Sequence, residues 1–150
     1  MSIQSLSKNR FRSQCLMVLL FIGISLAVVA EEIVIITAED NVETLDLDDV
    51  ARIFLGKVNQ FPSGEEVVPL NLDPSDPSYE AFARVVLKKT PSQLKAYWAK
   101  RIFTGKGKPP ASFESAEEVL NLVASDKRYL SYVDKHNINH QVRWVIVLNR

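Results

Sequence analysis

The 150-residue sequence contains a single cysteine, Cys15. This cysteine lies inside the most apolar stretch of the chain, whereas a lipoprotein carries its lipid-bearing cysteine directly after such a stretch. The chain after that stretch therefore has no thiol, and this excludes disulfides and cysteine-ligated metal sites there.

The sequence also lacks an apolar run of ordinary membrane-spanning length. The run 15–29 has about 15 residues, while a spanning helix needs roughly 20. Basic residues precede the run, and Ala30 and the acidic pair Glu31-Glu32 follow it. This pattern predicts a secretory signal peptide over 1–30, cut after Ala30, and one domain over 31–150. A retained membrane anchor is the competing interpretation.

The chain has no excess of charge of either sign, with 18 basic and 18 acidic residues. Removal of 1–30 takes away three basic residues and no acidic one, so 15 − 18 leaves a net charge of −3. Nucleic acid is therefore not an expected partner. The expected product is an exported protein that does not span the membrane.

Apolar periodicity and breaker residues predict four strands and four helices. We expect strands over 32–37, 66–72, 130–133 and 142–148, and helices over 46–55, 78–88, 91–104 and 115–123. The first strand has no polar alternation, which predicts burial on both faces. Pro69 indicates an edge or a bulge in the second strand. Gly56 and Gly105 are predicted to end their helices.

The helix after Thr90 has the most strongly specified start, because Thr90 begins a capping box. The spacing of Leu94, Trp98 and Ile102 predicts one buried stripe on this helix, with Arg101 nearer to water. The order of all elements predicts a three-layer α/β domain with a mixed sheet.

Two further patterns resemble parts of known ligand sites but lack other residues that such sites require. His136 and His140 have the spacing of a helical zinc pair, but the residues between them indicate a turn and no third ligand is evident, so no metal site is predicted. The Gly105-Lys106-Gly107-Lys108 loop lacks the other residues of a phosphate-binding P-loop. No catalytic residues and no cofactor can be assigned, and an enzyme is not expected.

Three segments, taken in order, resemble a known family. They are VARIFLGK over 50–57, FPSG leading to VVP over 61–69, and AYWAKRIFTGKGKPP over 96–110. This pattern is similar to the short periplasmic phosphate-binding-protein-like proteins, relatives of the substrate-binding component of bacterial phosphate ABC transporters. The resemblance implies a type II periplasmic binding protein fold, about one lobe in length, and export to the periplasm of a bacterium.

The resemblance also implies an oxyanion site at the start of the helix after the second strand. Relatives place a serine and an arginine there. Alignment on Phe82 puts Tyr79 at the place of the arginine and Asp76 near that of the serine. The candidate ligand-binding residues are therefore Ser75, Ser78 and Tyr79, although the nearby carboxylates oppose a phosphate dianion.

Two functions follow as hypotheses. The first is a non-enzymatic periplasmic protein that binds phosphate or another oxyanion, for uptake through a membrane permease or for sensing with a sensor kinase. The second is a single-lobe interaction module that has lost its ligand and contacts another envelope protein.

The signal peptide is directly testable. We expect the exported protein to begin at Glu31, because Ala30 is a small residue at the boundary between the apolar run and the acidic pair. N-terminal sequencing of the exported protein checks this expectation. A membrane-bound product that retains Cys15 would contradict it.

Overall fold

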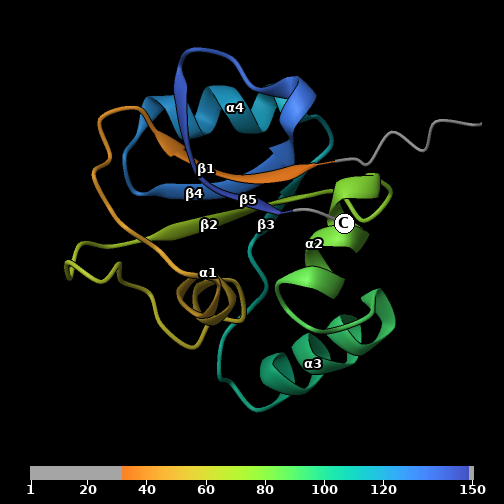
Figure 1. The fold of residues 1–150 in the computed structure, drawn as a ribbon. Helices are drawn as coiled ribbons and strands as arrows, with labels where there is room; N and C mark the ends of the chain where they lie inside the picture. The colour runs from red at the N-terminus through yellow and green to blue at the C-terminus, as the bar shows by residue number, and fades with distance from the viewer. Residues whose placement is uncertain (1–31, 149–150) are drawn as a thin grey trace, which may run out of the picture.

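A computed structural model describes residues 32–148, which form a five-stranded mixed sheet with helices on both faces (Figure 1). The strand order is β3-β2-β4-β1-β5. β2 runs parallel to β3 and β4, whereas β1 is antiparallel to β4 and β5. The strands are β1 (Ile33–Ala38), β2 (Val68–Leu72), β3 (Ala111–Phe113), β4 (Tyr129–Asp134) and β5 (Val142–Leu148).

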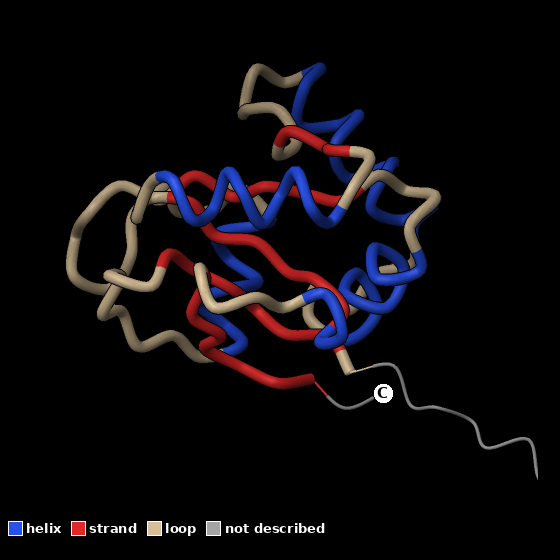
Figure 2. Tube along the Cα trace, turned by 90° about the horizontal axis from the view of Figure 1, so that it is seen from above, coloured by secondary structure: helices blue, strands red, loops and turns tan. Residues whose placement is uncertain are grey.

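The helices form two layers, one on each face of the sheet. They are α1 (Leu47–Phe54), α2 (Pro77–Val85), α3 (Pro91–Phe103) and α4 (Ala116–Ser125), with a short 3-10 helix, η1 (Lys135–Asn137), before β5. α4 lies along one face, as the view from above shows (Figure 2), and α1, α2 and α3 lie on the other side (Figure 1). This arrangement confirms the predicted three-layer α/β fold.

β1 is the most deeply buried strand, with all six residues buried. Successive side chains of a strand point to opposite faces, so burial of every residue requires a layer on each side. The helices supply both layers, while β4 and β5 cover the two edges of β1. The predicted strand and its burial on both faces are confirmed.

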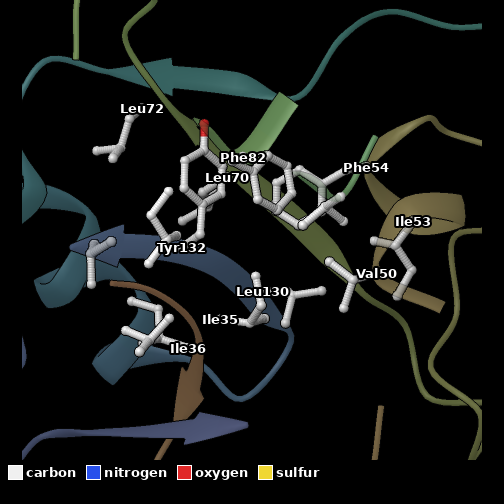
Figure 3. Close-up of a cluster of buried hydrophobic side chains, with 14 of the residues drawn as sticks. Ile35, Ile36, Val50, Ile53, Phe54, Leu70, Leu72, Phe82, Leu130 and Tyr132 are labelled. Atoms are coloured by element: carbon white, nitrogen blue, oxygen red, sulfur yellow. The ribbon is translucent and has the colours of Figure 1, made fainter. Parts of the chain in front are cut away.

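Three aromatic rings join the sheet to α1 and α2 (Figure 3). Phe82 of α2 stacks on Tyr132 of β4, with ring centroids 3.9 Å apart and planes 4° from parallel. Phe54 of α1 packs edge-on against Phe82 at 4.7 Å. Because all three rings are almost fully buried, they hold both helices at fixed positions on the sheet.

The helix termini follow the predicted chemistry. Asp46 and Thr90 each form a complete capping box at the start of α1 and α3. Gly56 and Gly105 follow these helices with φ of 62° and 67°, the left-handed region that glycine adopts without steric cost. Each glycine belongs to a Schellman motif, in which the last amides bond back to carbonyls of the final turn.

The inner face of α3 differs from the prediction at two residues. Leu94 and Trp98 are buried, but Ile102 is 57% exposed. Arg101 is half-buried, and its Nη2 donates to the carbonyl oxygens of Gly56 at 2.9 Å and Lys106 at 2.6 Å. α3 lies at the periphery, so only its first two turns reach the core. In the third turn the side chain that contacts the rest of the molecule is Arg101, not Ile102 as predicted.

The second strand also needs a correction. β2 is an interior strand, because β3, which the sequence pattern did not reveal, pairs with it from Leu70 onward. Pro69 precedes this pairing, so its missing N–H costs no ladder bond to β3. β3 has only three residues and two of them are exposed, which leaves no apolar alternation to detect.

Within residues 32–148, no helix is long and apolar enough to cross a membrane. The predicted signal peptide and its cleavage point lie outside the described residues.

Alanine substitutions at Gly56 and Gly105 separate the cost of crowding Trp98 from the cost of backbone strain, because both glycines have a left-handed backbone but only Gly56 lies against Trp98. A Cβ at Gly56 would lie 3.1 Å from the Trp98 ring, whereas a Cβ at Gly105 would meet open space. We expect Gly105→Ala to lower the free energy of unfolding by roughly 1 to 2 kcal/mol, from backbone strain alone. Gly56→Ala should cost about 1 kcal/mol more, because the ring must also move.

Urea unfolding of both variants checks this difference. Equal losses would show that Trp98 does not rest against Gly56.

Candidate functional site

The candidate site lies where β2 ends and α2 begins. The amide of Asp73 donates to the carbonyl of Phe113 at 2.8 Å, which ties the end of β2 to the end of β3. The amide of Asp76 then donates to the carbonyl of Asp73 at 2.9 Å, forming a tight turn into α2. These bonds hold the helix start at the carboxyl ends of two parallel strands, a common position for ligand sites in α/β folds.

Ser75 is exposed in this turn and is bonded to Asp73. Its amide and its hydroxyl both donate to Oδ1 of Asp73, at 2.9 and 2.7 Å. These two bonds lower the pKa of the Asp73 carboxyl below its ordinary value. Ser75 is therefore present at the predicted place, but a carboxylate of the chain already accepts its donors.

Ser78 and Tyr79 lie in the first turn of α2, which Asp76 caps. The buried Ser78 donates its amide to Oδ1 of Asp76 at 2.8 Å, and the amide of Tyr79 donates to the Asp76 carbonyl at 3.0 Å. A carboxylate at a helix N-terminus is favoured by the helix dipole. The Asp76 carboxylate thus stands where an oxygen of an external anion would stand.

The site lacks an arginine at the position that the resemblance indicated. Tyr79 is half-buried there, and loss of water raises the pKa of its hydroxyl. Arg84, the arginine of α2, lies in the last turn of the helix and forms an ion pair with Glu80 at 2.7 Å. The charges closest to the helix start are consequently carboxylates.

One residue that the sequence reasoning missed, Asn71, adjoins this turn. Asn71 of β2 accepts a hydrogen bond at Oδ1 from the hydroxyl of Tyr132, at 3.3 Å, and both side chains are buried. Burial raises the pKa of Tyr132 far above its ordinary value, so its hydroxyl stays protonated. The signal in the sequence was an asparagine between the two leucines that end the second strand.

The start of α2 can accordingly accommodate an oxyanion only in exchange for its own carboxylate. The amides of Ser75 and Ser78 are aimed as anion donors, but Asp73 and Asp76 occupy them. If the Asp76 side chain rotates away, the amide of Ser78 and the helix dipole become available to a ligand.

Two other hollows lie away from the start of α2 and are lined by different residues. One beside α1 is lined by Arg52, Lys57 and Asn59 among others, and one along α4 is lined by Glu117, Glu118 and neighbouring polar residues. In the part of the chain that the structure describes, no group of three histidine, aspartate, glutamate or cysteine side chains could hold a metal ion. His136 lies in η1 and contacts Asp134 at 2.7 Å.

Known proteins resemble this chain in structure but not in sequence. No protein-family model matches the chain, and no curated protein matches it in sequence. Two solved structures cover 77% of this chain and 45% of their own. One, described as a phosphate ABC transporter substrate-binding protein from Clostridium perfringens with bound phosphate, has a TM-score of 0.61 at 16% identity. The other, an ABC-type phosphate transport receptor from Vibrio cholerae, has a TM-score of 0.60 at 11% identity.

A third structure, PstS from Borrelia burgdorferi, covers 71% of this chain and 42% of its own, with a TM-score of 0.52 at 13% identity. The described residues therefore have the fold of a periplasmic binding protein. They correspond to about one lobe, since the chain spans less than half the length of the proteins that it matches.

Proposed function

We propose that this chain is a non-enzymatic binding protein for phosphate or a similar oxyanion, exported to the periplasm. The observation that supports this function best is the likeness of its fold to phosphate-transport binding proteins, one of which was solved with bound phosphate. The proposed partner is a membrane permease for uptake or a sensor kinase for signalling.

The proposed site is the start of α2, with Ser75, Ser78 and Tyr79 as its ligand-binding residues. Support comes from the helix dipole and from backbone amides that already bond anionic oxygens, although those oxygens belong to Asp73 and Asp76. In this proposal a phosphate oxygen replaces the Asp76 carboxylate on the Ser78 amide.

The proposed affinity is low, for two physical reasons. The ligand must displace an intramolecular carboxylate and approach a second one. A single lobe also covers only one side of an anion, whereas tight sites bury most of the ligand surface. We therefore expect a dissociation constant of roughly 0.1 to 5 mM at low salt, equivalent to about 3 to 5 kcal/mol.

The double variant Asp76→Ser, Tyr79→Arg tests this proposal by removing one carboxylate from the site and adding one positive charge. Serine is as good an N-cap as aspartate, so α2 keeps its start while losing the carboxylate. Arginine adds a bidentate donor for phosphate. In isothermal titration with inorganic phosphate, we expect the variant to bind at least about tenfold more tightly than the wild type, from roughly 1.4 kcal/mol or more of added interaction.

Asp48→Ser is the matched control, because Asp48 is exposed in the first turn of another helix, α1, and its replacement removes the same charge. If the double variant gains no more affinity than this control, the start of α2 is not the site. An absence of saturable phosphate binding in both the wild type and the double variant would overturn the proposed function.

A further inference from the structure

Positive charge is concentrated in one continuous part of this chain. Between Glu80 and Glu114 there are eight basic residues and no acidic one, whereas the rest of 32–148 has six basic and 17 acidic residues. The eight are Arg84, Lys88, Lys89, Lys95, Lys100, Arg101, Lys106 and Lys108. This stretch forms the end of α2, all of α3 and the loop to β3. We call it the basic end; its helix α3 lies at the bottom of Figure 1, away from the sheet.

The charges that the basic end leaves available to a partner belong to lysines. Both arginines are engaged within the molecule, Arg84 by Glu80 and Arg101 by the carbonyl oxygens of Gly56 and Lys106. Five exposed lysines make no ion pair among the described residues, namely Lys88, Lys95, Lys100, Lys106 and Lys108. Their ammonium groups are therefore hydrated and free to move.

The outer face of α3 is apolar between these lysines. Ala96, Ala99 and Phe103 recur at spacings of three and four, so they share one face of the helix, and all three are exposed. Phe103 is 93% exposed and the adjacent Ile102 is 57% exposed. Neighbouring exposed apolar side chains bordered by charged ones are a feature of surfaces that bind a protein or a membrane.

The composition of the basic end favours a lipid surface over a protein. Arginine is enriched and lysine depleted at protein interfaces, because a planar guanidinium suits fixed partners better than a mobile ammonium. Neither hollow described above is lined by a residue of α3, and the side chains of Ala96, Ala99 and Phe103 face outward. A second copy using the same face would bring like charges together.

We propose that the basic end docks on the surface of an anionic lipid bilayer. The lysines contact the lipid phosphates, while Phe103 and Ile102 enter the headgroup region. α3 is held rigidly for this contact, because the Tyr97 hydroxyl donates to the carbonyl of Leu55 at 2.7 Å and Trp98 packs on Gly56. This inference does not depend on phosphate binding at the start of α2, where Ser75, Ser78 and Tyr79 all precede the basic stretch.

Vesicle co-sedimentation of the chain beginning at Glu31 tests this proposal, after circular dichroism has shown that each protein is folded. The vesicles are phosphatidylcholine with or without phosphatidylglycerol, at about 50 mM and about 500 mM salt. We expect binding only with phosphatidylglycerol and loss of binding at high salt. The variant Lys95→Gln, Lys100→Gln, Lys106→Gln, Lys108→Gln should partition roughly 600-fold less, since each of the four lysines contributes about fivefold near an anionic surface.

Matched controls separate the basic end from general charge and apolarity. The double variant Lys57→Gln, Lys135→Gln removes two exposed lysines that lie outside the basic end. Val42→Ser removes an apolar side chain that is 87% exposed and also lies outside the basic end. Both controls should partition like the wild type, while Phe103→Ser should lose about tenfold. Equal binding to both vesicle types, or equal losses in the controls, would overturn the proposal. No vesicle binding at low salt would also overturn it and would favour an acidic protein as the partner.

Discussion

The stack of Phe82 on Tyr132 is the contact on which the rest of the structure depends. It joins α2 to β4, and Phe54 extends the same cluster to α1. Since the Tyr132 hydroxyl also bonds Asn71, one side chain fixes both the packing of α2 and the polar end of β2. The start of α2 is therefore a rigid location, and a change of ligand there requires movement of the Asp76 side chain rather than of the helix.

The charge distribution separates the molecule into two parts with different chemistry. Carboxylates cap helix starts, as Asp46 does in α1 and Asp76 in α2, and they are favoured there by the helix dipole. Lysines gather after the end of α2, on α3 and in the loop that follows α3, where no acidic residue is near in the sequence. A net charge close to zero thus conceals a basic end on an otherwise acidic domain.

Much of the fold could be predicted from local signals, because those signals act within one or two turns. The capping box of Thr90, the end of α1 at Gly56 and the unbroken apolar strand β1 all follow from neighbouring residues. The exposure of Ile102 and the interior place of β2 could not be predicted, because both depend on which distant element arrives beside them.

The helix start that carries the candidate site could be predicted from the sequence, whereas the hydrogen bonds within it were not predicted. The turn after β2 and the residues Ser75, Ser78 and Tyr79 follow from the family pattern. Sequence spacing showed that Asp73 and Asp76 were close, but it could not show that their oxygens accept bonds from the very amides a ligand would use. Both bonds are Asx turns, in which an aspartate accepts from the amide two residues on, and the two successive Asp-Pro-Ser sequences favour such turns.

Amide chemical-shift mapping of the wild-type protein during a phosphate titration tests the central claim most directly. If an oxyanion replaces the Asp76 carboxylate, the largest and saturable shifts should fall on the amides of Ser75, Ser78 and Tyr79. Largest shifts at Lys57 and Asn59, in the hollow beside α1, would place the anion elsewhere. Uniformly small, linear shifts across the domain would contradict an oxyanion site altogether.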